Sequence, residues 1–244
     1  IDFQNAQNDM PTTQSIASKF ASDKKDLIFA ISTPSAQAAF NATKDIPILM
    51  TAVSDPVAAG LVKTLEKPGT NVSGTSDFVS VDKGLELLKI FAPKAKTIGV
   101  MYNTSEVNSK VQVDALKEYA SKNGFKVVEK GITTSNEVNQ GISSLVGKID
   151  VLYVPTDNLV ASSMPIVSKI ATENKIPVIA AESGPVEKGA LACQGINYEK
   201  LGYKTGEMAV KILNGESVSD MPVATSDDTD IIVNEDILKA LGME

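Results

Sequence analysis

The sequence contains no histidine, no arginine and no tryptophan, and it has a single cysteine. Histidine is the commonest general base and metal ligand in enzymes, so its absence removes the usual catalytic and metal-binding chemistry. One cysteine can complete neither a zinc site nor an internal disulfide. We therefore expect no metal and no cofactor, and a buried structural role for Cys193.

The motifs of common enzymes are also missing. No glycine-rich dinucleotide fingerprint follows a strand, and neither a P-loop nor the G-x-S-x-G turn of hydrolases occurs. No histidine is present to activate a serine. These absences favour a binding protein over an enzyme.

Charge and hydropathy argue against nucleic-acid binding and against a membrane-spanning segment. The net charge of −7 argues against nucleic-acid binding, which needs a clustered basic face. No stretch approaches the roughly 18–20 apolar residues of a membrane span. The chain opens at Ile1 without a Met, a signal peptide or a lipidated Cys, which we interpret as a removed leader or as numbering that begins inside the natural chain.

Short apolar runs alternate with helix-like segments along the 244 residues. Such runs are typical of buried parallel strands, and the alternation predicts an α/β fold with right-handed crossovers. The expected strands are 1–3, 26–33, 46–53, 71–75, 97–103, 126–132, 151–154, 176–183, 191–197 and 231–234. The expected helices are 10–21, 34–44, 82–93, 109–124, 137–146, 159–175, 201–213 and a last short helix.

About ten strands could form one sheet, but the alternation of strands and helices is interrupted near Phe78 and again near Ile196. Two sheets of about five strands, in two lobes, fit these breaks better. The predicted lobes are residues 1–78 with 198–225, and residues 79–197 with 226–244. Acidic residues in the irregular stretch 215–230 are interpreted as a solvated run: Asp227, Asp228 and Asp230.

Polar side chains follow five of the predicted strands, where a helix begins. The clusters are 32–35, 54–56, 103–106 with 108, 156–158, and 182–184. Any one of them alone has the composition of a helix N-cap. Several carry more polar side chains than a cap needs, and ligands of open α/β sheets bind at the carboxyl ends of the strands. If two lobes face each other at these edges, the clusters converge on one cleft.

The chemistry of the clusters suits a zwitterion. Ser35 and the N–H groups after Pro34 begin a helix, which favours a carboxylate. Asp157, Asp55 and Glu106 offer acceptors for an ammonium group. The residues therefore predict a free amino acid as ligand. Aromatic residues nearby, which are candidates for contact with its side chain or for ordinary core positions, are Phe78, Tyr102 and Tyr153.

Several sequence segments resemble those of a known protein family. They are STPSAQAAFNATKDIPILMTAVSDPVAAGLV (32–62), KPGTNVSGTSD (67–77), KTIGVMYNTSEVNSKVQV (96–113), VPTDNLVASSMP (154–165) and GALACQGINYEKLGYKTGEMAVKIL (189–213). With the tail 222–242, they resemble the tryptophan/tyrosine/phenylalanine-type substrate-binding lipoproteins of ABC importers. The resemblance implies a type I periplasmic-binding-protein fold: two Rossmann-like lobes with parallel sheets, joined by a three-crossing hinge and closing on a ligand. The family normally begins with a further strand and helix before residues 1–3, and we expect either that this sequence omits them or that the first lobe has lost them.

The resemblance also implies which residues bind the ligand. These are Thr33, Ser35, Ala36, Asp55, Asp77, Phe78, Asn103, Ser105, Glu106, Asn108, Thr156, Asp157, Asn158, Glu182 and Ser183. Within this set it implies Asp157 as the partner of the ligand amine and Ser35 with Ser105 as partners of the carboxylate. We expect Asp157→Asn to weaken binding strongly and to leave the fold intact.

The implied function is that of an extracytoplasmic solute-binding protein that delivers an amino acid, aromatic by expectation (Tyr, Trp or Phe), to the permease subunits of an ABC importer. The same resemblance implies a signal peptide and a lipid anchor to the cell membrane of a low-GC Gram-positive bacterium. The alternative is a ligand-sensing effector domain of a transcription regulator or sensor with the same fold.

Overall fold

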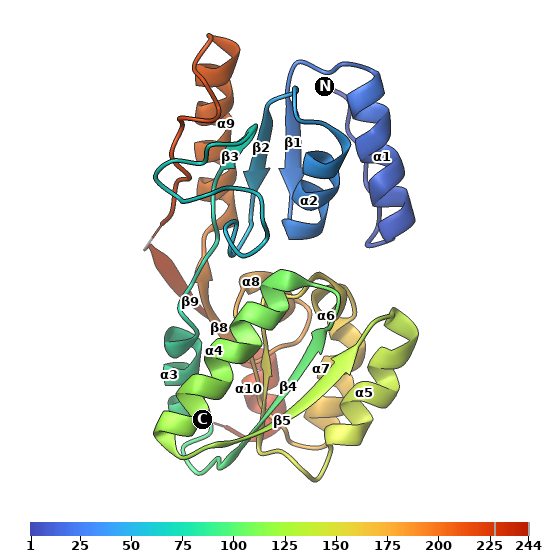
Figure 1. The fold of residues 1–244 in the computed structure, drawn as a ribbon. Coiled ribbons are helices and arrows are strands. Elements are labelled where there is room, and N and C mark those ends of the chain that lie inside the picture. The colour runs from blue at the N-terminus through green and yellow to red at the C-terminus, as the bar shows by residue number, and fades with distance from the viewer. Residues whose placement is uncertain (227, 244) are drawn as a thin grey trace. The chain divides into compact units, whose positions relative to one another are not determined.

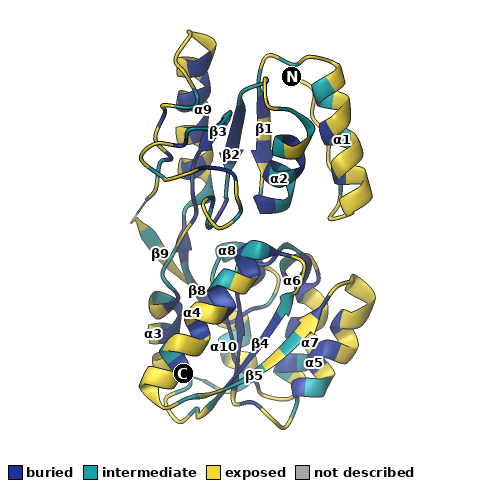
Figure 2. Cartoon of the chain, viewed as in Figure 1, coloured by how far each residue is buried: buried dark blue, intermediate teal, exposed yellow. Residues whose placement is uncertain are grey.

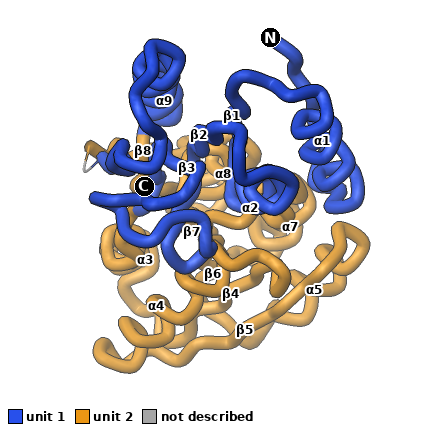
Figure 3. The backbone as a smooth tube through the Cα atoms, turned by 45° about the horizontal axis from the view of Figure 1, so that its top comes forward, with its two compact units in different colours: residues 1–78, 197–227 blue, residues 79–196, 228–244 orange. Residues whose placement is uncertain are grey.

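The computed structural model describes residues 1–226 and 228–243, which form two compact units (Figures 1 and 3). Unit 1 comprises Ile1–Phe78 and Asn197–Asp227, and unit 2 comprises Val79–Ile196 and Asp228–Glu244. The chain therefore passes between the units three times. Asp227, one of the residues assigned above to a solvated run, lies outside the described residues.

Unit 1 is a three-stranded parallel sheet of order β1-β2-β3 with helices on both faces. Its elements are α1 (Met10–Ser22), β1 (Ile28–Ile31), α2 (Thr33–Ala42), β2 (Ile48–Thr51), β3 (Val72–Gly74) and α9 (Tyr198–Leu213). Successive residues of a strand point to opposite faces. Accordingly, Ile48 and Met50 pack in the cluster that includes residues of α2, whereas Leu49 packs with Met208 and Ile212 of α9.

One face of β1 remains bare in unit 1. Phe29 is 49% exposed and Ile31 is 60% exposed, although their register partners on β2 are shielded. The expected strand at 1–3 is wrong, since Ile1 and Phe3 are exposed and form no ladder. A strand is defined by pairing with a neighbour, and residues 1–3 pair with none of the described strands.

Unit 2 is a six-stranded sheet of order β5-β4-β6-β7-β8-β9, in which β9 alone runs antiparallel to its neighbour. Its strands are β4 (Thr97–Asn103), β5 (Lys126–Ile132), β6 (Val151–Val154), β7 (Val178–Ala180), β8 (Ala192–Ile196) and β9 (Thr229–Val233). Its helices are α3 (Val81–Phe91), α4 (Val107–Asn123), the 3-10 turn Ser135–Glu137, α5 (Val138–Leu145), α6 (Asn158–Ser162), α7 (Met164–Glu173), α8 (Ser183–Glu187) and α10 (Glu235–Leu241).

Two apolar cores fill the faces of this sheet, and buried residues predominate in its central strands β4, β6, β7 and β8 (Figure 2). One core joins β4 and β6 to α5 and α7, and the other joins them to α3 and α4. All four residues of β6 are buried, as its apolar run predicts. Cys193 is buried in β8, and burial raises the pKa of its thiol to about 12, which confirms its structural role.

The structure corrects three details of the predicted fold. The sheets have three and six strands instead of about five each. The single helix expected at 159–175 is two helices, because Pro165 has no N–H to continue the first and instead begins α7. Asp230 lies within β9 and not in an irregular tail. In the described residues, no helix is both long and apolar enough to cross a bilayer.

Candidate functional site

The polar clusters of unit 2 follow β4, β6 and β7, three parallel neighbours of one sheet. Their carboxyl ends therefore share an edge, where ligands of such sheets bind. The backbone N–H of Asn103, at the end of β4, donates to Oδ2 of Asp157 at 2.6 Å. The structure thus brings together the predicted residues of the 103–108 and 156–158 clusters.

Asp157 has no exposed surface, and both of its carboxylate oxygens are occupied. Oδ2 accepts from the N–H of Asn103 and, at 2.7 Å, from the hydroxyl of Ser109. Oδ1 accepts from the N–H of Val160 at 2.8 Å and so caps α6. Through these hydrogen bonds the carboxylate connects β4, α4 and α6, so it stabilises the local structure.

Glu106 is also buried and collects amide donors. The side-chain amide of Asn158 donates to Oε2 at 2.6 Å, and that of Asn108 donates to the same oxygen at 3.1 Å. The amide of Asn103 donates to Oε1 at 3.1 Å. We call the two carboxylates and their side-chain donors the acidic cluster: Glu106, Asp157, Asn103, Asn108, Ser109 and Asn158.

Among the described residues, no lysine neutralises the two carboxylates of the acidic cluster. Burial and the nearby charge of Glu106 raise the pKa of Asp157 to about 6, against the three hydrogen bonds that it accepts. In the described chain, no lysine forms an ion pair with either carboxylate. The cluster therefore offers negative charge to a cationic group.

Two residues of α4 that sequence reasoning missed complete this edge. Gln112 accepts from the N–H of Thr156 and donates to its hydroxyl oxygen, both at 2.9 Å. Ser109 holds Asp157, as described above. The signal that could have found them is a run of polar residues on the inward face of α4, where Asn108, Ser109 and Gln112 are all buried.

The remaining predicted residues of unit 2 are more accessible. Ser105 is exposed, and its N–H donates to Oδ1 of Asn103 at 3.0 Å. Glu182 and Ser183 are half-buried where α8 begins after β7. The hydroxyl of Ser105 is thus accessible to a ligand on this side, in contrast to the buried carboxylate of Asp157.

In unit 1, the predicted residues follow β1, β2 and β3. Thr33 is buried and begins α2, and Ser35 is half-buried in its first turn. Ala36 is fully buried in the core of the unit. The preceding Ser32 has a φ of 78°, which is unusual for a residue other than glycine, and its side chain does not cap the helix.

Asp77, the last buried residue before the first crossing, accepts two hydrogen bonds. The hydroxyls of Ser54 and Tyr198 each donate to it at 2.9 Å, and burial raises its pKa. Sequence reasoning missed Tyr198, which is distant in the chain. Asp55 accepts from the N–H of Ala58 at 2.8 Å and closes a turn. Asp77 thus joins side chains of unit 1, and Asp55 organises part of its backbone.

Of the three aromatic candidates, Phe78 is the most accessible, with 51% of its surface exposed, and Tyr102 is half-buried. Tyr153 is a core residue packed beside Gly84. Tyr102 turns its hydroxyl to Glu129 of β5 at 3.3 Å and also packs against this core. Tyr153 is thus a core residue and Tyr102 is a half-buried residue beside this core, which favours the interpretation of both as ordinary core or surface aromatics.

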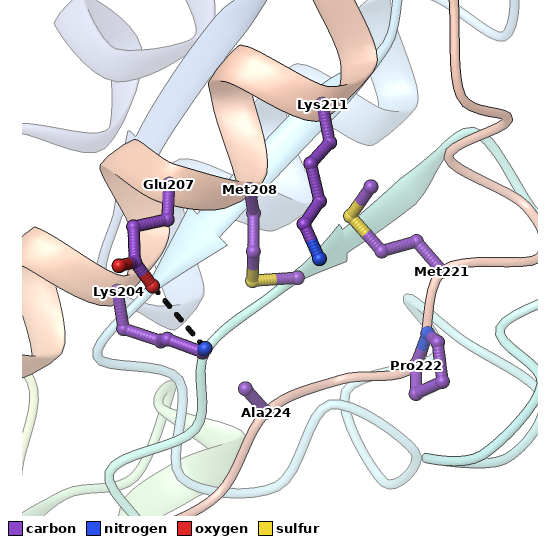
Figure 4. A pocket seen from close by; sticks show the side chains of 7 residues that line it. All are labelled: Lys204, Glu207, Met208, Lys211, Met221, Pro222 and Ala224. Carbon is purple, nitrogen blue, oxygen red and sulfur yellow. Dashed lines mark hydrogen bonds and ion pairs between the residues drawn. The ribbon is translucent and has the colours of Figure 1, made fainter.

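A small cavity of about 130 Å³ lies elsewhere in unit 1, between α9 and the segment 221–224 (Figure 4). Lys204 and Glu207 form an ion pair at its rim, and Met208 and Met221 line it. None of the predicted ligand-binding residues lines this cavity. In the described chain, no group of His, Cys, Asp and Glu residues is arranged to hold a metal ion.

Comparison with known proteins decides the family. The sequence model of the family described as "ABC transporter substrate binding protein" matches residues 1–244. The chain belongs to this family. The predicted resemblance is thereby confirmed, and with it the absence of an enzymatic role, because the family consists of solute-binding proteins.

This ABC substrate-binding protein is similar to one named protein and to several solved structures. It is 76% identical over 244 residues, 100% of its own length and 71% of the relative's, to a protein of Clostridioides difficile named "Tyrosine-binding protein". It is 38% identical, with a TM-score of 0.96, to a Streptococcus ABC domain solved in complex with L-Trp, of which it covers 82% with 99% of its own length. A conserved domain protein of Vibrio cholerae gives the same identity and TM-score, over 100% of this chain and 82% of that one.

These likenesses confirm the type I periplasmic-binding-protein fold. Solved structures that are only 12–18% identical, which include a transcriptional regulator, share the fold alone. They give no support to a regulatory function for this chain.

Proposed function

We propose that this protein binds an aromatic amino acid, with L-tyrosine as the first candidate, and delivers it to the permease of an ABC importer. The observation that carries the proposal is the 76% identity, over the whole chain, to a relative named for tyrosine binding. The relative with bound L-Trp, at 38% identity, supports the same ligand class.

The chemistry of unit 2 supports an amino acid with a free amine. The acidic cluster holds two carboxylates and no lysine partner among the described residues. An ammonium group near this edge gains Coulomb energy from both carboxylates together. We therefore assign the attraction of the amine to the pair Glu106 and Asp157 and not to Asp157 alone.

For the ligand carboxylate, the proposal keeps Ser35 and Ser105. Ser35 is half-buried in the first turn of α2, where free N–H groups favour an anion, and Ser105 is exposed beside the acidic cluster. Phe78 is the accessible aromatic for contact with the ligand side chain. The other proposed ligand contacts are Thr33, Ala36, Asp55, Asp77, Asn103, Asn108, Thr156, Asn158, Glu182 and Ser183, of which Ala36 requires a local shift because it is fully buried.

Isothermal titration calorimetry of the complete natural protein against the twenty amino acids tests the proposal. We expect tyrosine, tryptophan or phenylalanine to bind most tightly, with glycine and alanine as controls that leave the side-chain subsite empty. The proposal fails if no amino acid binds, or if aliphatic amino acids bind more tightly than every aromatic one.

The cellular setting is part of the same proposal. A binding protein of an ABC importer works on the outer side of the membrane, and the resemblance to lipoproteins supports a lipid anchor supplied by the natural chain. The Gram-positive source of the 76% identical relative supports a similar host.

A further inference from the structure

Two buried carboxylates of unit 2 share one set of donors without a compensating cation. Glu106 is 6% exposed and Asp157 has no exposed surface. The backbone N–H and the side-chain amide of Asn158 both donate to Oε2 of Glu106, and Asn103 donates to each carboxylate. Two like charges so close together in a buried site repel each other, so binding of one proton by the pair lowers its energy.

The same cluster contains a buried acceptor that lacks a donor. The side-chain nitrogen of Asn108 donates to Glu106 at 3.1 Å and to the carbonyl oxygen of Thr156 at 2.7 Å, which determines the orientation of the amide. Its Oδ1 is buried and has no hydrogen-bond partner among the described residues. A buried acceptor without a donor is unfavourable. A carboxyl O–H would add one donor to a cluster that is short of one.

The charged groups on the neighbouring elements do not neutralise the pair. Glu182, a further acid, begins α8, which packs against α6. Lys188, at the end of α8, donates to the carbonyl oxygen of Ala161 at 3.2 Å, at the opposite end of α6 from Asp157. Burial and the charge of Glu106 raise the pKa of Asp157 to about 6, which agrees with proton binding near neutral pH.

We propose that the pair Glu106 and Asp157 carries one exchangeable proton in the ligand-free protein and releases it when the ammonium group of an amino acid binds at the loops 103–108 and 156–158. The proposal rests on the proposed function. In this step one carboxyl O–H bond breaks, the proton passes to the buffer, and the carboxylate pair then faces the cation of the ligand. An amino acid keeps its own ammonium and carboxylate largely charged between pH 5 and 7, so the linked proton belongs to the protein.

Calorimetry with L-tyrosine tests this linkage on the complete natural protein. Titrations at pH 6 in two buffers of different ionisation enthalpy measure the protons released. A group with a pKa near 6 that becomes fully ionised on binding releases about half a proton at pH 6 and makes binding about tenfold weaker at pH 5 than at pH 7. Tight binding with no proton release and the same affinity at both pH values overturns the proposal and leaves tyrosine binding intact. Absence of binding to any amino acid overturns the proposed function itself.

Variants assign the proton to the pair. Glu106→Gln removes one of the two interacting charges, and we expect it to abolish the pH dependence. Asp114→Asn on the same helix is the matched control, since the Asp114 side chain is 78% exposed and lies outside the acidic cluster. We expect that variant to keep the tenfold change. A pH dependence that survives in a folded Glu106→Gln protein contradicts the assignment.

A second measurement uses the unaltered protein, in case Glu106→Gln does not fold. Carbon-13 spectra of protein labelled at the Asp and Glu carboxyl carbons report each titration directly. We expect one coupled titration between pH 5 and 7 in the free protein, which disappears when tyrosine is saturating. If no carboxyl group titrates in that range, the proposal is wrong.

Discussion

Asp157 accepts hydrogen bonds from three segments of unit 2, and all of these bonds are buried or nearly so. Its donors are the N–H of Asn103, the hydroxyl of Ser109 and the N–H of Val160. Because Asp157 has no exposed surface, an ammonium group could contact it directly only after the surrounding residues moved. The geometry therefore gives this residue a structural task, and its influence on a ligand acts through charge.

The first prediction concerns Asp157→Asn, which turns one oxygen into an N–H donor. That donor must face an existing donor, Asn103 or Val160, so at least one buried hydrogen bond is lost. Relief of the repulsion with Glu106 offsets part of this cost. We expect the free energy of unfolding at pH 7 to fall by about 1–3 kcal/mol, measured by urea denaturation. The hydrogen bonds of Asp157 therefore add a predicted loss of stability to the expectation that this variant keeps its fold.

Asp114→Asn serves as the matched control for that measurement. It removes an exposed charge on the same helix and a long contact of 3.8 Å with Lys117, which contributes little in water. We expect its stability to match that of the unaltered protein. Equal stability of both variants would show that Asp157 does not have the structural role that its hydrogen bonds indicate.

At the scale of elements, the pairing of β2 and β3 depends on a glycine. Gly74 ends β3 with a φ of 140°, a conformation that side chains rarely allow. A Cβ at this position would lie 1.9 Å from the backbone oxygen of Met50. The close approach aligns the following residues, because the N–H of Thr75 donates to that same oxygen at 2.9 Å.

We therefore predict that Gly74→Ala destabilises unit 1 severely, by about 3 kcal/mol or more, because it adds both backbone strain and a clash with main-chain atoms. Thermal unfolding followed by circular dichroism measures the loss. Gly184→Ala is the control, since a Cβ there meets no atom within 4 Å. A Gly74→Ala protein as stable as this control would mean that β2 and β3 can separate at low cost.

At the scale of the whole molecule, each unit has its own apolar cores, and three crossings of the chain connect them. A ligand that binds only the folded protein stabilises it by mass action. We predict that L-tyrosine at a hundred times its dissociation constant raises the free energy of unfolding by about 2.7 kcal/mol. Differential scanning calorimetry with tyrosine and with glycine checks this, and an identical shift with both would argue against a specific site.

Much of the fold could be predicted from local patterns. The apolar runs at 97–103 and 151–154 are strands, and each contains four consecutive buried residues, as suits a covered parallel sheet. The strand expected at 1–3 fails because a strand needs a neighbour, and local composition does not supply one. Similarly, Pro165 divides a predicted helix into two, although the apolar spacing continues across it.

The candidate site was predictable only in part. The residues that follow the strands were found, because the polar clusters recur at each carboxyl end. Ser109 and Tyr198 were not, because their partners lie 48 and 121 residues away in the chain. No local pattern reports which hydroxyl meets which carboxylate over such distances.

The sequence by itself therefore determined the alternation of strands and helices, the chemical types at the strand ends and the family. Which of those side chains are buried depends on how distant segments pack in the folded protein. Burial and hydrogen bonding depend on residues that are distant in the chain. The sequence therefore predicts Asp157 as a ligand contact, whereas the folded protein shows a buried carboxylate that accepts hydrogen bonds from other segments.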